Sequence, residues 1–103
     1  MATITKRDLV VDISNKTGLT QQQVFSVIQE TLDLMTERLA DGDSIVVRNF
    51  GTFHVREMKA KIGRNPKNPQ KDVEIPARAV VKFKPGKEMK EKVARLLPQI
   101  QNG

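Results

Sequence analysis

The sequence contains no cysteine, no tryptophan and no tyrosine, and its aromatic residues are four phenylalanines. Without cysteine the chain cannot form a disulfide scaffold, a thiolate zinc site or a thiol nucleophile, although such a chain is compatible with either redox compartment. The first twenty residues also lack an uninterrupted apolar stretch followed by a small-residue cleavage site. We therefore expect a cytoplasmic protein.

The length and composition bound the class of protein. The chain has 103 residues, of which 38% are hydrophobic and 29% are charged, as expected for one soluble globular domain. Lysine and arginine number 18 against 12 acidic residues, which gives a formal net charge of +6. This excess favours an anionic partner such as nucleic acid or an acidic membrane surface.

The positive charge is concentrated in the second half of the chain. Residues 1–53 carry five basic and seven acidic side chains, whereas residues 54–92 carry twelve basic and five acidic ones. The net charges of the two segments are therefore −2 and +7. We expect the partner-binding surface to lie in the second segment.

Three segments have the apolar spacing of helices. Helices are predicted at about 6–16 and 21–40, because Thr5 with Asp8 and Thr20 with Gln23 form capping patterns ahead of apolar repeats. The apolar stripe of the second helix is widened by Val27 and Leu34. A closing amphipathic helix is predicted from residue 87 to about Pro98.

The segment between the helices has the two-residue period of strands. Strands are predicted at 44–48 and 52–58, joined by a tight turn in which Gly51 can take a positive φ, and again at 73–75 and 79–83. The polar stretch 59–71 cannot pack into a core and is interpreted as a hairpin arm in solvent.

The order of elements defines an α+β fold. It comprises two N-terminal helices, a three-stranded antiparallel sheet with a long β-hairpin arm, and a C-terminal helix. We expect one domain, with a helical base at 1–42, a sheet at 43–86 whose arm spans about 59–75, and the C-terminal helix at 87–98.

The expected core is small for an independent monomer. With the arm in solvent, only about eighty residues remain, a size at which a single chain is often marginal. The broad stripe of the second helix and Phe50, Phe53 and Phe83 on the sheet suggest that a second copy supplies the missing core. A small monomer with a modest core is the alternative.

The sharpest motif is the run from Gly63 to Pro66 in the middle of the basic arm. Two-stranded ribbons fit a DNA groove, and their basic side chains neutralise phosphates. Proline suits the tip because it has no N–H, its φ is fixed, and its rigid ring can wedge between base pairs. Alternatively, Pro66 and Pro69 serve only as turn formers.

Several motifs together resemble one known family. The run from Arg48 to Phe53, the run from Gly63 to Pro66, and the run from Phe83 to Lys87 resemble the HU and integration host factor family of bacterial DNA-bending proteins. The resemblance covers residues 4–95. It implies an intertwined homodimer, or a heterodimer with a paralogue, whose two arms lie in the DNA minor groove with a proline intercalated at each tip.

The resemblance also implies a set of DNA-binding residues. Pro66 matches the intercalating proline, and Arg64 and Asn65 match its neighbours. The other basic positions on the arm and body are Arg56, Lys59, Lys61, Lys67, Lys71, Arg78, Lys84, Lys87, Lys90 and Lys6. The implied function is a nucleoid-associated architectural protein of low sequence specificity; the alternative is a site-specific DNA bender of the integration host factor type.

Three positions depart from the family pattern. Asn49 replaces the usual glycine or serine before Phe50, although asparagine can adopt a turn conformation. Met58 stands where many members have arginine, and Lys59 would point to the other face of a regular strand. After Pro66 the segment 67–70 is longer by one residue than the usual turn.

Rival chemistry has little support. His54 is the only histidine, so we expect no metal or catalytic role for it, and Asp41 to Asp43 lacks the other ligands of a calcium loop. Arg48 to Phe53 is only faintly like an RNA-recognition strand. A nuclease would need clustered carboxylates or histidines, and a membrane binder would leave the arm unused. We therefore expect no enzymatic activity, cofactor, metal, membrane or small-molecule substrate.

Overall fold

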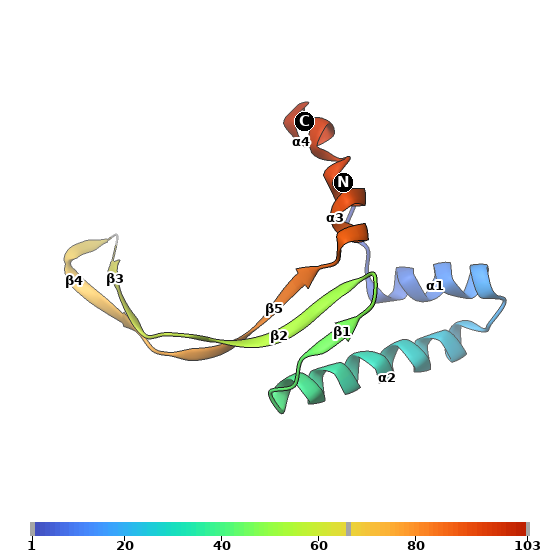
Figure 1. Ribbon diagram of the computed structural model, residues 1–103, viewed down its shortest axis with the longest axis horizontal. Helices are drawn as coiled ribbons and strands as arrows, with labels where there is room; N and C mark the ends of the chain where they lie inside the picture. Colours follow the sequence, from blue (N-terminus) through green and yellow to red (C-terminus); the bar gives the residue numbers. More distant parts are fainter. Residues whose placement is uncertain (1, 66, 103) are drawn as a thin grey trace. The chain divides into compact units, whose positions relative to one another are not determined.

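The structure of the protein, a computed structural model, describes residues 2–65 and 67–102 (Figure 1). Of residues 64, 65 and 68–72, the backbone alone is described. The chain divides into two compact units, residues 1–37 and 38–103. Its elements are α1 (Lys6–Thr17), α2 (Gln21–Ala40), β1 (Ile45–Val47), β2 (Gly51–Met58), β3 (Lys61–Asn65), β4 (Asn68–Ile75), β5 (Arg78–Pro85), α3 (Lys87–Ala94) and α4 (Leu97–Asn102). The predicted α+β class is confirmed.

Both N-terminal helices begin with the capping boxes that the sequence predicts. The Asp8 amide donates to Thr5 Oγ1, and the Thr5 amide donates in return to Asp8 Oδ2 at 3.0 Å. Thr20 and Gln23 make the equivalent pair at the start of α2, at 3.0 and 3.1 Å. Each box satisfies amides that have no partner within the helix, and so fixes where the helix begins.

The second unit is built on a three-stranded antiparallel sheet with the order β1-β2-β5. The eight residues of β2 pair with the eight of β5, from Gly51 opposite Pro85 to Met58 opposite Arg78. β3 and β4 form a separate two-stranded ladder, which is the predicted arm. Figure 1 shows it continuing outward from β2 and β5.

The arm keeps the register of the sheet from which it extends. Met58 pairs with Arg78, and three residues further along each strand Lys61 pairs with Ile75, so no residue is inserted on either side of the break. Pro76 lies in the break and has no N–H to donate to a ladder. Near the tip the register shifts between Arg64 and Asn65, which leaves residues 69–71 of β4 without a partner on β3. The ladder is therefore irregular near the tip.

The turn between β1 and β2 differs from the prediction. Asn49, and not Gly51, adopts the positive φ, at 66°. Gly51 is required for a different reason, because a Cβ at this position would lie 2.5 Å from Phe83 Cε1 and 2.7 Å from the Lys84 carbonyl oxygen. The close approach of the Phe83 ring, rather than a left-handed conformation, calls for glycine here.

The C-terminal helix also differs from the prediction, because it is two helices. α3 ends at Ala94, and α4 begins at Leu97 after a turn. Pro98 therefore lies in the first turn of α4 instead of ending the closing helix. Proline lacks the amide that would continue a helix from α3, but it is well accommodated in a first turn.

Few apolar side chains are buried in the single chain. In the described part, Val10 and Val24 are the buried hydrophobic residues, at 5% and 3% exposure. Phe50, Phe53 and Phe83 form a cluster with ring centroids 4.7 to 6.4 Å apart, yet Phe50 remains 46% and Phe83 40% exposed. Both units therefore leave apolar surface uncovered.

Candidate nucleic-acid interface

The pairing of β2 with β5 sorts their side chains onto two faces. Directly opposed residues of an antiparallel pair project to the same side, and successive pairs alternate. The pairs Phe53–Phe83 and Val55–Val81 therefore share one face with Glu57 and Ala79. The alternate pairs form a second face, here called the basic face: Thr52–Lys84, His54–Lys82, Arg56–Val80 and Met58–Arg78.

The basic face carries cations and no carboxylate. Arg56, Arg78, Lys82 and Lys84 are all exposed, and none of them forms an ion pair within the described part of the chain. Glu57, the one acidic residue of β2 and β5, lies on the apolar face. Unpaired cations on one face of a sheet produce a positive potential suited to phosphate groups.

A shallow hollow beside the sheet brings three of the predicted lysines together. Lys84 lies at the end of β5, while Lys87 and Lys90 lie in the first turn of α3. All three line one hollow, which residues 51–52 and 85–86 also line. The hydrogen bond from the Gly86 amide to the Phe50 carbonyl oxygen, at 2.8 Å, ties the start of α3 to the turn between β1 and β2.

The predicted arm residues lie beyond the basic face, and for some of them only the backbone is described. Lys59 is exposed and follows the last residue of β2, while Lys61 is exposed and pairs with Ile75 on β4. Lys67 is exposed in the turn before β4. Arg64 and Asn65 on β3 and Lys71 on β4 are placed by their backbone, and the predicted wedge, Pro66, lies outside the described residues. Their roles stay predictions.

Lys6 belongs to the first unit, where its ammonium group already has partners. Its Nζ donates to Gln29 Oε1 and lies 5.1 Å from the centroid of the Phe25 ring. These contacts hold the Lys6 side chain against α2. A contact between Lys6 and phosphate stays a prediction.

Two members of the basic face were missed by sequence reasoning. Lys82 lies between Lys84 and Val80 on β5, and His54 lies opposite it on β2. The sequence signal was the two-residue step from Lys84 to Lys82, which puts both lysines on one side of a strand. The pairing of His54 with Lys82 required the register, which the sequence did not give.

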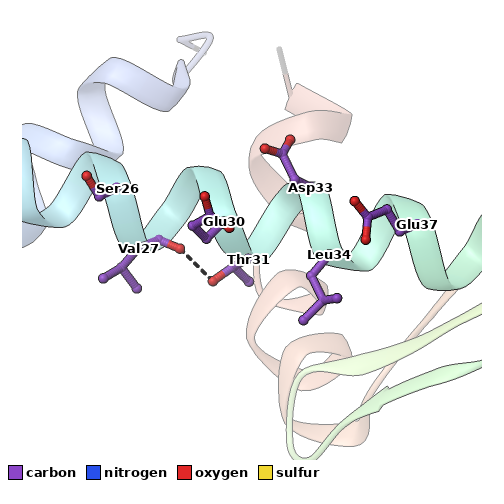
Figure 2. A pocket seen from close by; sticks show the side chains of 7 residues that line it. All are labelled: Ser26, Val27, Glu30, Thr31, Asp33, Leu34 and Glu37. Carbon is purple, nitrogen blue, oxygen red and sulfur yellow. Dashed lines mark hydrogen bonds between the residues drawn. The ribbon is translucent and has the colours of Figure 1, made fainter.

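A second hollow, along α2 in the first unit, has the opposite charge. Figure 2 shows its seven lining side chains, including Val27 and Leu34 with the carboxylates of Glu30, Asp33 and Glu37. Three carboxylates disfavour a phosphate group. In the described ranges, no group of three or more acidic, histidine or cysteine residues is arranged to hold a metal ion. No helix in that part of the chain is long and apolar enough to cross a membrane.

Comparison with known proteins identifies the class to which this fold and its basic face belong. Residues 4–94 match the family described as bacterial DNA-binding protein. The chain therefore belongs to this family, the HU and integration host factor family of histone-like DNA-binding proteins.

Individual relatives come from both branches of the family. A probable DNA-binding protein HU of Chlamydia trachomatis is 49% identical over 90 residues, which cover 87% of this chain and 90% of the relative. Integration host factor subunit alpha of Caulobacter sp. (strain K31) is 38% identical over 96 residues, covering 93% and 95%. The HU of an Anabaena HU–DNA cocrystal structure has a TM-score of 0.80 at 39% identity, covering 87% of this chain and 97% of that chain.

Proposed function

We propose that this protein is a nucleoid-associated architectural protein of the bacterial cytoplasm, which acts as a dimer, binds duplex DNA with little sequence specificity through the minor groove, and bends it. The observation that carries the proposal is the separation of the two faces of β2 and β5. One face presents Arg56, Arg78, Lys82 and Lys84 without a carboxylate, and the other presents the phenylalanines. A sheet sorted in this way can face phosphate on one side and an apolar core on the other.

The dimer is supported by the apolar surface that one chain leaves open. Phe25, Leu32 and Leu34 on α2 are between 44% and 51% exposed. On the second unit, Phe50 is 46% and Phe83 40% exposed. Large apolar side chains exposed together are typical of an interface. A second copy of the chain would cover it, as the resemblance to the family implies.

Binding through phosphates accounts for low sequence specificity. Affinity would come mainly from release of counterions, with a log–log salt slope of about −0.9 for each phosphate neutralised. The minor groove distinguishes little beyond A·T from G·C pairs. In this proposal Pro66 is the rigid wedge that opens a base step and localises the bend.

A second candidate function is site-specific bending of the integration host factor type. It is favoured by the 38% identity to an integration host factor alpha subunit over 93% of the chain. Specificity of that kind rests largely on the deformability of DNA, so the same basic face and arm would serve either function.

A binding titration on linear, nicked and four-way-junction DNA tests the proposal and separates the two candidates. Preference for the nicked or branched DNA supports the non-specific architectural function, whereas tight binding to one linear sequence supports the site-specific function. Stronger binding to anionic vesicles than to duplex DNA, or cleavage of the DNA in magnesium, would contradict both. Lys16→Ala, on the last turn of α1, is a charge-matched control for variants of the basic face.

A further inference from the structure

The basic face contains a cross-strand pair formed by His54 and Lys82. His54 on β2 is directly opposite Lys82 on β5, between the pairs Thr52–Lys84 and Arg56–Val80. We propose that His54 and Lys82 form a further phosphate-binding position, and that His54 takes up a proton from solvent when DNA binds there. This inference rests on the proposed function, because it requires the DNA backbone to lie on the basic face.

The surroundings of His54 favour an anionic ligand. Its ring is half-buried, whereas Lys82, Lys84 and Arg56 beside it are exposed. On its other side, the pairing of β1 with β2 begins at Ile45 opposite Phe53 and so stops one residue short of His54. The acids that precede β1, Asp41 and Asp43, form no ion pair with the ring. Cations are thus its charged neighbours on the sheet.

These neighbours couple proton uptake to DNA binding. Histidine is the side chain that ordinarily changes charge between pH 5 and 8, with a usual pKa of about 6.5. A phosphate held on the basic face by Lys82 and its neighbours attracts a positive charge on His54, and a protonated imidazole can donate from both ring nitrogens. The bound state therefore holds more protons than the free state.

The composition of the chain makes this proton uptake easy to isolate. The sequence has one histidine and no cysteine, so the α-amino group is the only other group that ordinarily titrates near neutral pH. His54→Gln removes the imidazole proton and leaves the amino terminus unchanged. His54→Lys keeps a positive charge at every pH of interest, and both variants are checked for folding by circular dichroism at the concentrations used.

The test measures the affinity for one linear duplex from pH 5.5 to 8 at fixed salt. For the wild type, we expect the association constant to rise as the pH falls, by up to tenfold per pH unit for each proton taken up. The His54→Gln variant should bind more weakly at pH 6 and show little dependence on pH. The His54→Lys variant should bind tightly, and its association constant should depend equally little on pH. Calorimetry in two buffers of different ionisation enthalpy should detect the proton uptake in the wild type alone.

Lys82 is tested through the salt dependence. Lys82→Ala should reduce the log–log salt slope by about 0.9 for each protomer in contact with DNA, whereas Lys16→Ala should leave it unchanged. Wild-type affinity that is independent of pH, or a pH dependence that survives in His54→Gln, would overturn the proton-linked contact while leaving the proposed function standing. Absence of duplex binding at every pH would instead contradict the proposed function itself.

Discussion

Gly51 on β2 lies so close to the ring of Phe83 on β5 that a Cβ at this position would be 2.5 Å from Cε1. The Lys84 carbonyl oxygen would lie 2.7 Å from the same Cβ, so movement of the phenylalanine ring alone cannot make room. The packing of the aromatic cluster therefore depends on the missing side chain of Gly51.

We expect Gly51→Ala to lower the free energy of unfolding by about 1–3 kcal/mol, the usual cost of overpacking a core. Gly63→Ala on the arm is the matched control, because a Cβ there would lie 3.4 Å from Ile75 Cδ1, at the edge of ordinary contact. Chemical denaturation at one protein concentration measures both. Equal stability of Gly51→Ala and wild type would show that the sheet can open around Phe83.

The thermal midpoint should rise with protein concentration. In the proposed dimer, a second copy covers the exposed apolar side chains of α2 and the partly exposed phenylalanine cluster. Association linked to folding makes the midpoint depend on concentration. Calorimetric scans over a hundredfold range of concentration measure the effect. A constant midpoint together with a monomeric sedimentation mass would contradict the dimer.

The N-terminus of α1 should contribute stability that is lost in acid. The Thr5 backbone amide, followed by the Thr5 hydroxyl, donates to the Asp8 carboxylate and lowers its pKa from the usual 3.8. Because the pKa is lower in the folded state, the contribution is complete well above pH 3.8 and disappears as the pH falls through the lowered value.

Two substitutions test the contributions of Thr5 and Asp8 to this cap separately. Thr5→Ala should cost about 1 kcal/mol at pH 7 by removing the N-cap. Asp8→Asn should destabilise the protein at pH 7 but become equal to wild type in strong acid. Parallel unfolding curves for Asp8→Asn and wild type at every pH would rule out this role for the Asp8 carboxylate.

Cations of the basic face should each account for part of the salt dependence. Arg56→Ala or Lys84→Ala should weaken binding to all duplexes alike and reduce the log–log salt slope by about 0.9 per protomer in contact with DNA. Titrations at several salt concentrations, with Lys16→Ala as the control, measure the slope. A slope that matches wild type would mean that the substituted residue does not contact phosphate.

The sequence predicted the elements well because their signals are local. Capping pairs such as Thr5 with Asp8 and the loss of apolar residues in the arm depend only on neighbours in the chain. The need for glycine at position 51 depends on the ring of Phe83, which is distant in sequence. The position of His54 on the basic face likewise depends on the strand register. The break between α3 and α4 depends on where Pro98 lies within a helical turn.

Bending of the bound DNA is tested most directly by energy transfer between dyes at the two ends of a short duplex. Binding of the wild type should bring the ends together and raise the transfer. The Pro66→Ala variant should still bind, since the cations of the basic face remain, but should raise the transfer less because alanine cannot wedge a base step. Tight binding of the wild type with no change in transfer would contradict the account.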